Sequence, residues 1–144
     1  MLTLKDKVWI NTVVPIVSQR LRELWDNAAA AGRPQRPLAD VAQDHGKVLW
    51  PSDYPSGGAV GPESPTILLD RGYNGKRPLY LVQGADGSVH AAWGTWFGRS
   101  SGFAFYWNAD ALLLERIFSP AERSRILYDF EAALARAARE DQSA

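Results

Sequence analysis

The sequence predicts an α+β fold, in which a four-stranded antiparallel meander is packed by an N-terminal helix and two C-terminal helices. Apolar residues recur at three- and four-residue steps near both ends of the chain, which is typical of helices with one buried face. Between these regions lie four short segments with strand character, joined by turns that contain glycine. The length of 144 residues predicts one domain, residues 1–144, with a hydrophobic core of its own.

The first helix is predicted over residues 13–31, where the apolar positions form one stripe. Thr12 is suited to cap this helix, and Pro15 falls in its first turn, where a missing N–H costs little. Gly32 is suited to end it, because glycine adopts the left-handed conformation that closes many helices. Residues 7–10 are interpreted as a short strand or an extended lead-in.

The region between the first helix and the strands is predicted to be mostly irregular. Two prolines in residues 33–37 prevent the helix from continuing. One or two helical turns are expected over residues 38–44. The proline- and glycine-rich residues 47–65 form a long loop, a kind of segment that often carries function. The aromatic residues of this loop are Trp50 and Tyr54.

The predicted strands alternate with turn residues in the middle of the chain. Asp86-Gly87 separates two of them, and Asp-Gly between β-type segments is a strong hairpin signal, because both residues accept positive φ. If these two residues form the centre of a two-residue turn, Gln83 lies opposite His90. The four strands are residues 66–70, 79–83, 88–94 and 103–107.

The last third of the chain is predicted to form two helices. Asn108 is a good N-cap for a helix over residues 109–118. Ser119 and Glu122 then stand at the two positions of a capping box, with proline between them at the first helical position. The helix that they open has one apolar face, and residues 140–144 are expected to fray.

Composition and charge exclude several classes of protein. The chain has 16 Lys+Arg and 16 Asp+Glu, and this balance argues against a protein that neutralises many phosphates of a duplex. With no cysteine, disulfide frameworks, thiolate metal sites and thiol catalysis are excluded. The sequence contains no recognisable metal-ligand spacing or cofactor motif, so neither a bound metal nor a cofactor is expected. It shows no secretory signal and no membrane-spanning run, so a soluble, cytoplasmic protein is predicted.

Residues 93–107 are unusually aromatic, with seven aromatic side chains in fifteen residues. Strand alternation places Phe103, Phe105 and Trp107 on one face and Tyr106 on the other, so one interior cannot enclose them all. Exposed aromatic residues next to arginine are typical of protein-interface hot spots. The sequence therefore predicts a partner-binding surface. Its residues are Trp96, Phe97, Arg99 and Tyr106, with Trp50 and Tyr54 in the flanking loop.

These observations favour a small non-enzymatic binding protein that engages another protein, as bacterial inhibitor, immunity and accessory proteins do. The alternative is a metal-independent nuclease or other anion-handling enzyme that uses His45, His90 and Arg99. Two imidazoles exchanging protons with one substrate, and a cation that holds developing charge, can cleave a phosphodiester. This mechanism requires both rings to reach a common cleft.

A third hypothesis is single-strand nucleic-acid binding on the aromatic sheet. Residues 71–107 carry Arg71, Lys76, Arg77 and Arg99 against Asp86 alone, so this part of the chain is locally basic. Single-strand binding requires these cations to cluster beside exposed rings on which bases stack. It is less favoured than a protein partner, and no membrane partner is expected.

Overall fold

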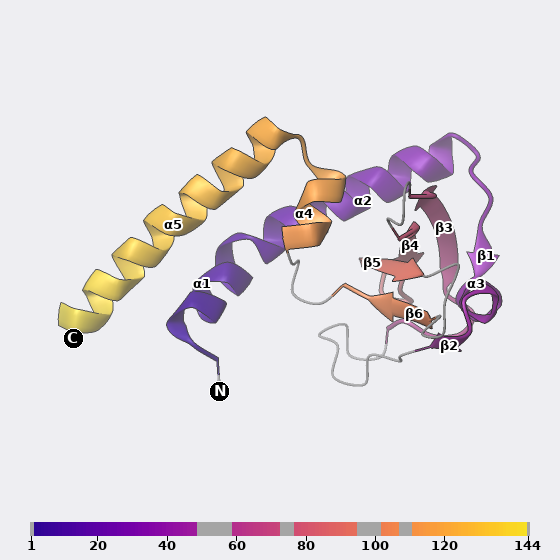
Figure 1. The fold of residues 1–144 in the computed structure, drawn as a ribbon, viewed down its shortest axis with the longest axis horizontal. Helices are drawn as coiled ribbons and strands as arrows, with labels where there is room; N and C mark the ends of the chain where they lie inside the picture. The colour runs from indigo at the N-terminus through magenta and orange to yellow at the C-terminus, as the bar shows by residue number, and fades with distance from the viewer. Residues whose placement is uncertain (1, 49–58, 73–76, 95–101, 107–110, 144) are drawn as a thin grey trace. The chain divides into compact units, whose positions relative to one another are not determined.

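The computed structural model describes residues 2–48, 59–72, 77–94, 102–106 and 111–143 (Figure 1). The chain divides into two compact units. One comprises Met1–Arg20 and Asn108–Ala144 and is helical where it is described, and the other comprises Leu21–Trp107 and holds the sheet. Both helices and strands are therefore present, as an α+β fold requires.

Helix α1 (Leu4–Thr12) and helix α2 (Val14–Ala30) follow each other at the N-terminus. A capping box opens α1, in which Thr3 and Asp6 each accept a hydrogen bond from the other's backbone N–H at 3.1 Å. The interpretation of residues 7–10 as a strand or extended lead-in is wrong, because α1 includes them. α2 matches the predicted first helix, and Gly32 ends it with a φ of 75°. The prediction that Thr12 caps this helix is wrong, because Thr12 is the last residue of α1.

The helical unit is completed by α4 (Ala111–Ile117) and α5 (Pro120–Ser143). The predicted capping box of α5 is confirmed: Ser119 Oγ accepts from the N–H of Glu122 at 3.2 Å, and Glu122 Oε1 accepts from the N–H of Ser119 at 3.0 Å. α1 packs against α5, with the rings of Trp9 and Phe130 edge to face at 5.0 Å. The predicted cap Asn108 lies outside the described residues.

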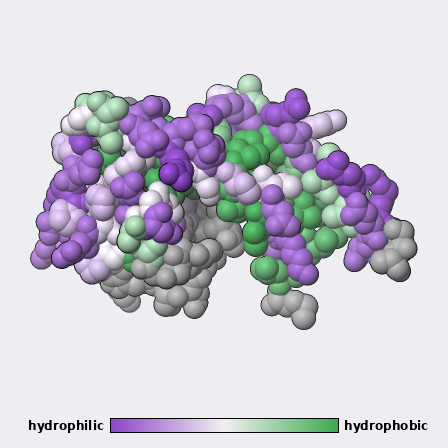
Figure 2. All heavy atoms as spheres, turned by 180° about the vertical axis from the view of Figure 1, so that it is seen from behind, coloured by the Kyte–Doolittle hydropathy of each residue, from purple (hydrophilic) through white to green (hydrophobic). Residues whose placement is uncertain are grey.

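Exposed large apolar side chains belong to the helical unit in the part of the chain that the structure describes. Seen from behind, hydrophobic residues also show at the surface among the helices (Figure 2). The most exposed is Tyr128, at 72% of its area, followed by Leu112 at 61%. The others are Leu2, Leu127, Ile16 and Leu4.

The second unit contains a sheet of six strands in the order β1-β3-β4-β5-β6-β2. The predicted antiparallel meander forms its centre, and each pair from β3 to β6 is antiparallel. β1 and β2, of two residues each, extend its edges and were not predicted, because so short a segment has no periodicity to recognise. The strands are β1 (Arg36–Pro37), β2 (Lys47–Val48), β3 (Pro65–Asp70), β4 (Leu79–Gln83), β5 (Val89–Gly94) and β6 (Gly102–Phe105).

The hairpin between β4 and β5 forms where it was predicted, but its register differs by one residue. Gly87 has a φ of 85°, and the N–H of Gly84 donates to the carbonyl of Ser88 at 2.8 Å, so the loop has three residues rather than two. His90 therefore lies opposite Val82, not opposite Gln83. A shift of one residue moves a side chain to the other face of a sheet relative to its partner strand.

Helix α3 (Leu38–Asp44) packs on the face of the sheet to which His90 belongs. The side chains of this face are fixed by register, since directly opposite residues of antiparallel strands share a face. That the N-terminal and C-terminal helices pack against the sheet stays a prediction. The core under α3 comprises Leu38, Val41, Ala42, Tyr80, Val82, Ala92 and Phe103.

Candidate functional site

Most of the predicted partner-binding residues lie outside the described part of the chain. These are Trp96, Phe97 and Arg99 between β5 and β6, and Trp50 and Tyr54 in the preceding loop.

Tyr106 is described, and it is not the exposed anchor that the sequence predicts. Only 7% of its area is exposed. Its backbone N–H donates to the carbonyl of Ala91 at 3.0 Å, so the pairing with β5 continues past the end of β6 and holds Tyr106 against the sheet.

The other described rings of the aromatic segment divide between core and surface. Phe103 is 1% exposed, because it lies opposite Gly94 on the face covered by α3. Phe105 is two residues further along the same face, where it is only partly buried, and its ring meets that of Phe103 at 5.9 Å. Trp93 is also partly exposed. The described part of this segment therefore leaves some aromatic surface accessible.

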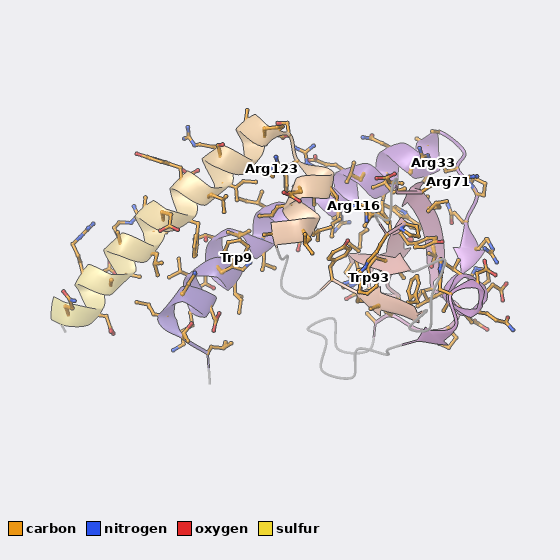
Figure 3. All side chains as sticks on the ribbon, in the orientation of Figure 1. Trp9, Arg33, Arg71, Trp93, Arg116 and Arg123 are labelled. Atoms are coloured by element: carbon orange, nitrogen blue, oxygen red, sulfur yellow. The ribbon has the colours of Figure 1, made fainter. Side chains whose placement is uncertain are left out.

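The exposed Arg77 and the partly exposed Trp93 form a cation–π pair at the sheet. The guanidinium carbon of Arg77 lies 3.7 Å from the centroid of the Trp93 ring, and Figure 3 shows Trp93 on the sheet. Sheet register produces this contact, because Trp93 lies opposite Leu79 and Arg77 stands two residues before Leu79 in the chain. We call Arg77 and Trp93 the Trp93 surface. The sequence contains both residues but no local signal that brings them together.

His45 is a buried core residue at the end of α3. Its side chain is 1% exposed, and its Nε2 lies 2.7 Å from the hydroxyl oxygen of Tyr80, within hydrogen-bond distance. Its ring also lies 6.0 Å from that of Phe103. Burial raises the pKa of the Tyr80 phenol, with a smaller contribution from the negative charge of Asp44. The phenol therefore stays neutral near pH 7 and can serve as a hydrogen-bonding group in the core.

His90 belongs to a chain of polar groups that begins at the hairpin turn. Ser88 Oγ donates to Asp86 Oδ1 and lies 2.7 Å from His90 Nε2. A hydroxyl has one proton, so while Ser88 donates to the carboxylate, His90 Nε2 must be the donor to Ser88. A serine nucleophile requires the opposite order, in which the imidazole accepts the hydroxyl proton. These hydrogen bonds therefore stabilise the turn and are not arranged to activate Ser88 as a nucleophile.

Stability is expected to fall as the pH drops below about 6.5, the ordinary pKa of histidine. Burial lowers the pKa of His90, opposed in part by Asp86, so the unfolded chain takes up a proton before the folded one does. The contribution of His90 to the free energy of unfolding is complete above the pKa that it has in the unfolded chain. This contribution is lost as the pH falls toward its lower pKa in the folded protein. Urea midpoints at pH 7.5 and 5.5 measure this loss.

His90→Gln is the variant that isolates this effect, because glutamine retains hydrogen-bonding groups and does not titrate. Its midpoint should change less between the two pH values than that of the wild type. Asp86 and Glu122 do not confuse the comparison, because hydrogen bonds lower their pKa values below 3.8 and 4.5. Equal losses in both proteins would contradict the prediction.

The two histidines lie on the same face of the sheet but have separate partners. The His45 ring lies against Gly94, and His90 stands four residues earlier in β5, which corresponds to about 13 Å along a strand. Neither ring lines the cavities described in this structure. Arg99, the third group of the nuclease hypothesis, lies outside the described residues. No described feature brings these groups to one substrate.

The structure also places three arginines around one cavity that sequence reasoning missed. Arg33 and Arg36 lie in the connector after α2, and Arg71 follows β3. The sequence shows two of these arginines close together, but their approach to Arg71 depends on the pairing of β1 with β3.

Within the described ranges, no three His, Asp or Glu side chains are grouped so that they could hold a metal ion. Among the helices described, none combines the length and apolar character needed to cross a membrane. Comparison with protein-family models, curated proteins and solved structures found no match to this chain.

Proposed function

We propose that this chain is a cytoplasmic, non-enzymatic binding protein that engages another protein, in the manner of an inhibitor, immunity or accessory protein. Its binding surface combines the Trp93 surface with three residues of the adjoining β5–β6 connection. Trp50 and Tyr54 contribute from the flanking loop. The three residues of the connection are Trp96, Phe97 and Arg99.

The observation that supports this proposal best is the cation–π pair of Arg77 and Trp93. Tryptophan and arginine are the residue types most enriched at binding hot spots, together with tyrosine. The contact of 3.7 Å favours one orientation of a long arginine side chain before a partner binds. Preorganised side chains lose less conformational entropy on binding, so more of the contact energy contributes to affinity.

Charge indicates the character of the partner. Arg77 is exposed, and the segment from residue 71 to 107 carries four cations against one carboxylate. Complementary potentials accelerate association and select among partners. A protein that presents an acidic patch next to an apolar one fits this surface.

Replacing Arg77 or Trp93 with alanine is expected to weaken partner binding by at least about tenfold, which is the size of a typical hot-spot effect. The measurement is capture from nuclease-treated lysate of the native host, compared between immobilised wild type and variants, followed by titration of the captured protein. Trp96→Ala and Phe97→Ala extend the test to the predicted residues that are not described.

Two controls make this comparison specific. Tyr128→Ala removes an aromatic ring that is 72% exposed on α5, and it should leave capture unchanged. Arg77→Lys keeps the charge but loses the planar guanidinium, so its affinity should fall between wild type and Arg77→Ala. A partner retained equally by the wild type and by all the variants at residues 77, 93, 96 and 97 would contradict the proposed surface. A partner that is captured from untreated lysate but not from nuclease-treated lysate would contradict a protein partner.

A further inference from the structure

A cavity of about 440 Å³ opens at the edge of the sheet where β1 pairs with β3. This volume lies within the range of small-molecule sites. Arg33 and Arg71, labelled in Figure 3, lie near each other at this edge. The cavity is lined by Arg33, Pro34, Arg36, Val41, Asp44, Thr66, Leu68, Leu69, Arg71 and Tyr80.

Arg33 is held in place by the end of α2 and by β3. Its backbone N–H donates to Ala28 at 3.1 Å, next to the left-handed Gly32. Its Nη1 donates to the carbonyls of Leu68 and Leu69, both at 2.9 Å. A guanidinium has five N–H donors, and within the described residues these are the only partners of Arg33's side chain. Within that part of the chain, the other three N–H donors of this guanidinium have no partner.

The other two arginines differ in how they are held. Arg36 Nη1 donates to Asp44 Oδ2 at 2.8 Å, which orients its guanidinium and raises its pKa. Arg71 is exposed, and its side chain has no hydrogen-bond or ion-pair partner among the residues that the structure describes. Three arginines and one carboxylate line the cavity, so its charge is +2. A ligand with two negative charges would neutralise it.

The remaining wall is largely apolar. Val41, Leu68 and Leu69 supply the apolar part. Thr66 and Tyr80 complete the wall, and their hydroxyls are hydrogen-bonded to the Ser64 carbonyl and to His45 Nε2. Thr66 and Tyr80 are 1% and 5% exposed, so they are fixed parts of the core rather than surface side chains. A bare inorganic anion would leave the apolar wall unused.

We propose that this cavity binds a phosphomonoester carried on a small organic body. A phosphomonoester has a charge of about −1.5 to −2 near pH 7, which matches the lining charge. Arginine forks bind phosphate oxygens in pairs of parallel hydrogen bonds. The organic body packs on the apolar wall. Neither Arg77 nor Trp93 lines this cavity, so the inference is independent of the proposed protein-binding function.

Phenyl phosphate is the probe for the test, titrated into the full chain at pH 7.5 and constant ionic strength. Binding is followed by the chemical shifts of arginine Nε–H groups. Saturable binding is expected, with inorganic phosphate weaker because it lacks the ring, and benzoate weaker because it carries one charge.

Two cavity variants should change affinity in opposite directions. Arg71→Gln is expected to weaken phenyl phosphate binding about tenfold, the effect of losing charge-assisted hydrogen bonds. Asp44→Asn is expected to strengthen binding, because it removes the only negative charge among the lining residues while keeping an acceptor for Arg36. The matched control is Arg139→Gln, an exposed arginine of α5 outside the cavity, which should have no effect.

Three results would overturn this inference. Absence of saturation shows that no site exists at this position. Equal losses in Arg71→Gln and Arg139→Gln show diffuse attraction to surface charge. Benzoate binding as tight as that of phenyl phosphate shows a carboxylate site rather than a phosphate site.

Discussion

Phe103→Ala should destabilise the chain by about 3–5 kcal/mol, the usual cost of removing a fully buried aromatic ring. Phe103 is 1% exposed, and its ring lies 5.6 Å from that of Tyr80 and 6.0 Å from that of His45. Alanine at this position leaves a cavity that neither the sheet nor α3 can fill without moving. Urea unfolding, followed by tryptophan fluorescence, measures the loss.

Phe105→Ala provides a matched control for this prediction. Phe105 stands two residues later on the same strand and the same face, but it is only partly buried. Its replacement should cost clearly less, about 1–2 kcal/mol, because less apolar area leaves water. Equal effects of the two substitutions would show that Phe103 is not the ring that anchors the core.

Gly94→Ala is expected to destabilise the chain by about 1–3 kcal/mol, as overpacking of a core does. A Cβ atom at Gly94 would stand 2.6 Å from His45 Nδ1, closer than van der Waals contact permits. The imidazole has little room to give way, because it is 1% exposed, packed near Phe103 and hydrogen-bonded to Tyr80. Urea midpoints of wild type and variant measure the cost.

Two further variants distinguish steric conflict from a general intolerance of alanine. At Gly61, an added Cβ would meet no atom within 4 Å, so Gly61→Ala should be nearly neutral. His45→Ala removes the ring with which the new Cβ collides. Adding Gly94→Ala to His45→Ala should therefore cost much less than adding it to the wild type. A cost that is unchanged in the His45→Ala background would contradict the clash.

The position of the β4–β5 hairpin was predicted from the sequence, but its register was not. Asp86-Gly87 correctly located a turn, because positive φ at Gly87 is a local property of the chain. The dipeptide alone did not predict the loop length: the N–H of Gly84 donates to the carbonyl of Ser88, and Asp86 Oδ1 accepts from the N–H of Ser88 at 3.0 Å, in a three-residue loop. This difference of one residue changed the partner of His90 from Gln83 to Val82.

The candidate sites were the least predictable part. Arg77 and Trp93 are sixteen residues apart, and only the register of β4 with β5 brings them into contact. The arginine cavity likewise requires β1 to pair with β3, and β1 has only two residues. A sequence pattern cannot predict such convergence, because it arises from pairing between distant segments.

Local chemistry was sufficient for the capping box at Ser119 and Glu122, the helix end at Gly32 and the meander itself. Each of these depends on residues within a few positions of one another, whose backbone preferences favour one conformation. The tertiary structure decided which rings are buried, which way His90 faces and which arginines meet. Alternating strand patterns leave the choice of face open until pairing and helix packing select one, so the same aromatic segment contains both the core residue Phe103 and the partly exposed Trp93.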